Sequence, residues 1–135
     1  MTGKSIRIQA VAFAGVVALL AATTLVYAAD SAKEAETAAH HATLASKADN
    51  IDIVHKHLHH VVNCLVGPKG EGFDAKEANP CAALGDGAIP DTTDSAVKTT
   101  LMDALKTANA GLASDDLSAA QKDASETAAT LAKVK

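Results

Sequence analysis

The chain has 135 residues, enough for one domain, and its 12 basic and 16 acidic side chains give a net charge of −4 with histidines neutral. An acidic surface repels phosphate backbones and anionic lipid head groups, which argues against nucleic-acid binding and against stable membrane association. Only 2% of the residues are aromatic, so any core must be built from small aliphatic side chains, alanine above all.

Residues 1–28 have the pattern of a secretory signal peptide. Lys4 and Arg7 form a short basic region, and an uncharged run of apolar or small residues follows from Ala10 to Leu25. Cleavage after Ala28 would leave small side chains at the positions that a signal peptidase reads. We therefore predict export to the periplasm and removal of this segment.

The exported protein would be a single helical domain at residues 29–135. Loss of Lys4 and Arg7 removes two positive charges and no negative ones, so its net charge would be −6. An uncleaved N-terminal anchor is the alternative interpretation, because the apolar run of about 16 residues is marginal against the roughly 20 that span a bilayer.

Two helices are predicted in the first half of this domain. Residues 31–48 are rich in Ala, Glu and Lys without Gly or Pro, and Asp30 or Ser31 can serve as the N-cap. The pair Asp49-Asn50 interrupts this helix. Asp49 can then cap a second helix at residues 51–66.

Residues 67–93 are predicted to be an irregular loop. This segment begins with Gly67-Pro68, a helix-ending pair, and holds all three prolines of the chain and most of its glycines. Cys64 precedes it and Cys81 lies within it, and in an oxidising compartment the two are expected to form a disulfide worth about 3 kcal/mol. Thiolate metal ligation or redox chemistry is the alternative, although the sequence has no C-x-x-C pair.

Two further helices are predicted, at residues 94–110 and 115–134. Gly111 is expected to end the first, and Ser114 to cap the second. Their inward residues, at helical spacing, are Val97, Leu101, Leu105, Ala108 and Leu112 in the first and Leu117, Ala120, Ala124, Ala128 and Leu131 in the second.

These elements predict an all-α fold, a small up-and-down four-helix bundle. One pattern favours an alternative: apolar or histidine residues follow a strict 3-4 alternation from His41 to Leu65, across the interruption at 49–50. A continuous helix of about 35 residues, packed on a helical hairpin, would show the same alternation. The bundle is favoured because Asp-Asn is a poor helix interior and average helices are much shorter.

Six histidines are the main chemical signal of the chain, and all fall within a short stretch: His40, His41, His55, His57, His59 and His60. On a helix, His55 and His59 share one face and His57 and His60 another, so residues 55–60 alone cannot direct four imidazoles at one ion. A turn at 49–50 would bring position 41 opposite position 58, so that three or four imidazoles converge.

We predict that these six histidines are the ligands of a divalent transition metal. Neutral imidazole binds copper, nickel and zinc, and copper is preferred because Cu(II) binds most tightly in the Irving–Williams order. The predicted function is sequestration or transport of this metal in the periplasm. A solvated or pH-responsive histidine surface is the alternative interpretation.

The histidine-bearing segments resemble a known group of proteins. The stretches AETAAHHATLASKA and HKHLHH, in a signal-bearing, Ala- and Glu-rich helical chain, are similar to the small periplasmic histidine-rich metal-binding helical proteins of the SmbP type. The resemblance covers residues 30–62. It implies sequestration of divalent metal, copper especially, in the periplasm.

Other function classes fit the sequence less well. The chain has no H-E-x-x-H motif, nucleophile elbow or Gly-rich phosphate loop, so we predict that it is not an enzyme. A b-type haem carrier could use Met102 and a histidine as axial ligands. A structural or interaction protein could dock an unidentified periplasmic partner through the 67–93 loop, with Phe73, Ile89 and Pro90 in contact.

Overall fold

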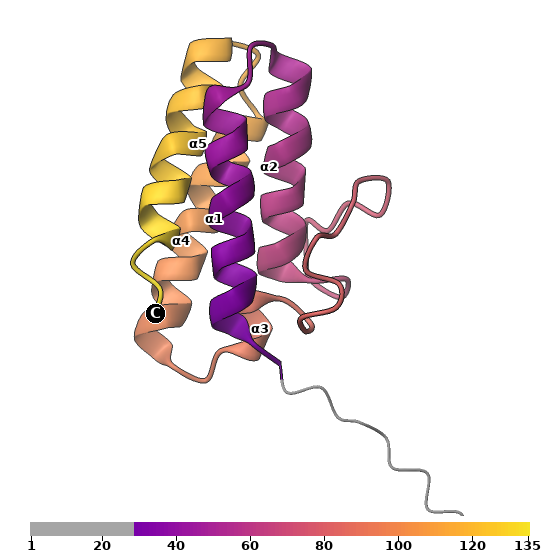
Figure 1. Cartoon of the computed structure of the whole chain (residues 1–135), viewed down its shortest axis with the longest axis vertical. Helices are drawn as coiled ribbons and strands as arrows, with labels where there is room; N and C mark the ends of the chain where they lie inside the picture. The colour runs from indigo at the N-terminus through magenta and orange to yellow at the C-terminus, as the bar shows by residue number, and fades with distance from the viewer. Residues whose placement is uncertain (1–28) are drawn as a thin grey trace, which may run out of the picture.

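The computed structural model describes residues 29–135, and this part of the chain is all-helical. The predicted signal peptide lies outside the described residues. Four long helices form an up-and-down bundle, and a short fifth helix lies at one end of it (Figure 1). The helices are α1 (Ser31–Lys47), α2 (Ile51–Val66), α3 (Ala88–Asp91), α4 (Ser95–Leu112) and α5 (Leu117–Leu131). The predicted four-helix bundle is therefore confirmed.

The four long helices are arranged in a ring. In this ring α1 packs against α2 and α5, and α4 packs against the other sides of the same two helices. Successive helices run in opposite directions, so the α1–α2 turn and the α4–α5 turn lie at the same end of the bundle (Figure 1). None of the described helices is long and apolar enough to cross a membrane.

Side-chain caps set where the long helices begin. Asp30 caps α1 and Asp94 caps α4, as their carboxylates accept hydrogen bonds from backbone N–H groups of the first turn. The cap of α2 is Asn50 rather than the predicted Asp49, with the Ile53 N–H donating to Asn50 Oδ1 at 3.0 Å. Likewise, Asp116 and not Ser114 caps α5. In both cases the cap is the residue immediately before the first helical residue, because only from there does a side chain reach the free N–H groups of the first turn.

The chain breaks between α1 and α2, so the continuous-helix alternative is wrong. Ala48 and Asn50 are in extended conformations, which reverse the chain direction. The buried face of α1 is an alanine stripe at 3-4 spacing: Ala35, Ala38, Ala42 and Ala45. Leu44, part of the alternation that suggested one long helix, is 37% exposed.

The core of the bundle contains a few large side chains, most of them on α2, with Leu101 of α4 and Leu131 of α5 beside them. Val54, Leu58, Val61 and Leu65 on α2 are fully buried against the alanine faces of the other helices. Gly111 does not end its helix as predicted but lies inside α4, where a Cβ atom would be 2.7 Å from Leu58 Cδ1. Glycine at this position thus lets α4 approach α2 closely.

The 67–93 segment is tied to the bundle at several points. The predicted disulfide between Cys64 and Cys81 is present and joins the loop to α2. Gly67 ends α2 with φ of 66°, and a Cβ atom there would overlap the Asp86 carbonyl where the loop returns. The loop also contains α3, a helical turn that the sequence analysis did not predict.

A buried carboxyl group joins α1 to the end of this loop. Glu34 is fully buried, and the Gly87 N–H donates a hydrogen bond to Glu34 Oε1 at 3.0 Å. Burial is the main cause that raises the pKa of Glu34; the Gly87 hydrogen bond lowers it and the nearby Asp91 carboxylate raises it, and together they bring it to about 7. Glu34 therefore fastens the loop end to α1.

Candidate metal centre

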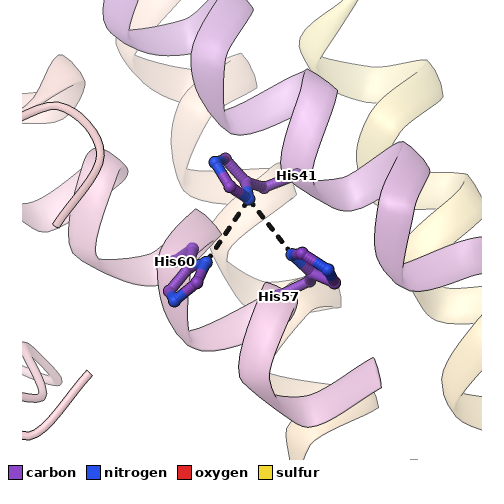
Figure 2. A group of neighbouring side chains, drawn as sticks. All are labelled: His41, His57 and His60. Atoms are coloured by element: carbon purple, nitrogen blue, oxygen red, sulfur yellow. Dashed lines mark hydrogen bonds between the residues drawn. The ribbon is translucent and has the colours of Figure 1, made fainter. Parts of the chain in front are cut away.

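Three of the six histidines converge between the first two helices. His41 comes from α1, and His57 and His60 come from α2 (Figure 2). His57 and His60 share one face of α2 because they are three residues apart. The turn at 48–50 folds α1 back along α2 and brings His41 opposite them. This pairing of α1 with α2 was predicted from the position of the turn.

The ring nitrogens point toward a common centre. His41 Nδ1 lies 3.2 Å from His57 Nδ1 and 3.4 Å from His60 Nδ1. Two nitrogens bound to one ion at about 2.0–2.1 Å in tetrahedral geometry would lie about 3.3–3.4 Å apart. One potential ligand atom from each of the three side chains lies within 4.8 Å of the others. The group can therefore hold a metal ion with little movement.

Protons alone satisfy this arrangement poorly. His41 Nδ1 contacts two other Nδ1 atoms, and each neutral ring nitrogen is either a donor or an acceptor. If His41 Nδ1 carries a proton, that N–H can donate to the other two nitrogens. A second proton, on His57 Nδ1 or His60 Nδ1, would then point at the first. A single cation at the centre would accept all three lone pairs at once.

The electrostatic environment keeps the three imidazoles neutral. Burial, followed by repulsion from His60, His57 and His40, lowers the pKa of His41 from 6.5 to about 4. Burial also lowers the pKa of His57 and of His60, with Lys56 adding to the effect at both. Neutral imidazole is the form that binds metal, so the three side chains are ready as ligands at neutral pH.

The lowered pKa of His41 can be measured directly. In the metal-free protein, we expect His41 to be half protonated near pH 4 in an NMR titration, well below the ordinary value of 6.5. Because the folded-state pKa lies below the unfolded one, the stability that His41 contributes is complete above pH 6.5 and is lost as the pH falls toward 4. A midpoint near 6.5 would show that His41 is hydrated and outside the cluster.

The other three histidines lie outside this cluster. His40 is exposed, and its ring contacts His41 edge-on with centroids 5.6 Å apart. His55 Nε2 is 2.9 Å from the Ser114 carbonyl oxygen, at the α4–α5 turn. His59 Nδ1 is 3.8 Å from an Asp74 carboxylate oxygen. The predicted pair of His55 and His59 thus faces other partners, and Cys64 is committed to the disulfide and is not a thiolate ligand.

Two carboxylates of the loop lie beside histidines of α2, and neither was predicted from the sequence. Asp74 lies next to His59, and Glu77 Oε2 lies 3.7 Å from His60 Nε2. A signal for them exists in the sequence. Cys64 lies one helical turn beyond His60, so a disulfide from Cys64 to Cys81 must bring the residues just before Cys81 close to that end of α2.

The alternative sites of the sequence analysis are separate from the histidines. Met102 is 56% exposed on α4 and lines a surface cavity of about 450 Å³, together with Ile89 and Pro90. The described residues that line this cavity include no histidine, so it offers no Met–His pair for a haem. Phe73 and Ile89, expected to dock a partner, pack partly against the protein's own core.

No protein-family model, curated protein or solved structure matches the chain. The geometry of the histidine cluster is therefore the best guide to what the protein does.

Proposed function

We propose that this protein is an exported carrier or sequestering protein for a divalent transition metal ion, held by His41, His57 and His60. The observation that carries the proposal is the convergence of three neutral imidazole nitrogens from two helices at spacings that suit one ion. Most solvated histidines on a helix surface point outward and have a pKa of about 6.5. These three point at one another.

Copper is the metal we favour. The three ligands are all imidazole nitrogens, which suit copper, nickel and zinc, and Cu(II) binds most tightly to such sites. The two cysteines are bonded to each other, so the thiolates that would favour a closed zinc site are absent from the ligand set. The described residues place no fourth side chain in the group, which leaves a position where water or a ligand from another protein can bind.

An open coordination position on the metal suits a protein that carries the ion to a recipient. A metal held by three ligands can be passed on through a fourth that comes from the recipient, whereas a closed four-ligand site retains its ion. The disulfide is compatible with an oxidising compartment, which supports the proposed periplasmic location. We propose no catalytic role.

The six histidines allow a matched test. The purified, metal-stripped protein would be titrated calorimetrically with Cu(II), Ni(II) and Zn(II), beside two triple variants. In the first variant the cluster residues His41, His57 and His60 are changed to alanine. In the second the other three are changed: His40, His55 and His59.

We expect sub-micromolar binding of one ion by the unmodified protein, with Cu(II) the tightest. This binding should be lost in the cluster variant and kept in the other. Equal loss of binding in both variants would show that the ion binds to histidines in general and not to the three residues of the cluster. Binding no tighter than that of an unstructured histidine peptide would refute the proposed function.

A further inference from the structure

We infer that Glu77 is a positioning residue of the metal centre and acts as a hydrogen-bond acceptor for His60. Glu77 lies on the disulfide-bonded loop, which the fold holds beside α2. This inference rests on the proposed function and goes beyond it, because it assigns to the disulfide-bonded loop a part in metal binding. The two ring nitrogens of His60 face different surroundings.

His60 is the most enclosed of the three ligands. Its side chain is 9% exposed, Nδ1 faces the cluster, and Nε2 is buried without a hydrogen-bond partner among the described residues. If Nδ1 binds the ion, the proton of the neutral ring must be on Nε2. A buried N–H group without an acceptor is costly, so this tautomer needs a partner.

Glu77 is placed to be that partner. Its Oε2 is 3.7 Å from His60 Nε2, and its side chain is 32% exposed. This distance is about 0.7 Å longer than an N–H···O hydrogen bond. A small movement of the Glu77 side chain would close it. Metal-bound histidines commonly donate their second N–H to a carboxylate, which orients the ring and raises its basicity.

The backbone around Glu77 is held by one buried side chain of α2. Asn63 is fully buried, and its Nδ2 donates to the carbonyl oxygens of Asp74 at 2.9 Å and Ala78 at 3.1 Å. A longer contact of 3.4 Å reaches the carbonyl of Glu77 itself. In return, the Asp74 N–H donates to Asn63 Oδ1 at 2.9 Å.

The residue that makes these hydrogen bonds, Asn63, lies close in the sequence to the proposed metal ligands of α2. Asn63 follows His60 by three residues and adjoins Cys64, whose disulfide anchors the far end of the same loop segment. The hydrogen bonds of Asn63 and the disulfide of Cys64 together fix the position of residues 74–81 relative to α2. The loop thereby presents the Glu77 carboxylate at the outer edge of His60, while the metal would bind at the inner edge.

The test compares Glu77→Ala and Glu77→Gln with Glu71→Gln. Glu71 is an exposed residue of the same loop, so its variant makes the same charge change away from His60. We expect Cu(II) to bind 10–100-fold more weakly to Glu77→Ala, the range typical for loss of such a partner. Glu77→Gln should weaken binding less, because its amide oxygen still accepts the hydrogen bond. Glu71→Gln should stay within about threefold of the unmodified protein.

A second readout separates positioning from folding. Nitrogen-15 NMR of the histidine rings should show the Nε2–H tautomer at His60 in the unmodified protein and a mixture of tautomers in Glu77→Ala, at an unchanged unfolding midpoint. Unchanged affinity and tautomer in Glu77→Ala would overturn the inference while leaving the proposed function intact. Equal weakening in Glu71→Gln would overturn it in favour of general charge effects. Absence of metal binding by the unmodified protein would refute both.

Discussion

The His41→Ala variant is expected to bind Cu(II) at least about 100-fold more weakly than the unmodified protein, a loss of about 2.7 kcal/mol. Of the three proposed ligands, His41 alone comes from α1, and its Nδ1 contacts both of the others. Without it, His57 and His60 are two neighbours on one helix, an arrangement that any surface i,i+3 pair offers. Calorimetric titration of the single variant measures this loss.

The same variant is expected to abolish stabilisation by metal. An ion held by α1 and α2 binds only the folded protein, so free metal at 100 times its Kd should raise the free energy of unfolding by about 2.7 kcal/mol. Urea unfolding with and without Cu(II) tests this, and His40→Ala is the matched control because its side chain is exposed and outside the cluster. A full metal-dependent gain in His41→Ala would place the ion elsewhere.

The second large effect concerns the disulfide. The Cys64→Ala, Cys81→Ala double variant is expected to lose about 3 kcal/mol of stability, because the bond closes a 17-residue loop and so restricts the unfolded chain. Both cysteines are buried, so the lost sulfur contacts add to this figure. Urea unfolding at neutral pH measures the change.

A reducing agent provides the control for the disulfide prediction. A dithiol should lower the unfolding midpoint of the unmodified protein by nearly as much as the double variant does, and it should leave the double variant unchanged. A double variant as stable as the unmodified protein would contradict the prediction. In that case the hydrogen bonds of Asn63 and Glu34 would be enough to hold the loop.

The fold was largely predictable from local signals. Alanine-rich segments, polar caps and the Gly67-Pro68 stop each act within a few residues, so they place the helices without knowledge of the tertiary structure. The errors arose where packing decides. Gly111 has the composition of a helix end, yet it lies inside α4 because Leu58 occupies the space a side chain would need.

The candidate site was predictable in part for the same reason. The turn at residues 48–50 and the i,i+3 spacing of His57 and His60 together brought the right segments into register. Which of the six histidines meet depends on the rotation of α1 about its axis, and that rotation is set by its alanine stripe packing against the bundle. Glu77 depends on the fold of an irregular loop, which no periodic pattern describes.

The alanine face of α1 has a further consequence. A methyl group buries far less apolar area than a leucine side chain, so α1 is joined to the bundle by comparatively weak dispersion and hydrophobic contacts. We therefore expect α1 to open locally before α2 does, with backbone amides that exchange with solvent sooner. His41 would leave the site whenever α1 opens. The lifetime of the bound ion would then be governed by the opening rate of one helix, and cargo release would need no global unfolding.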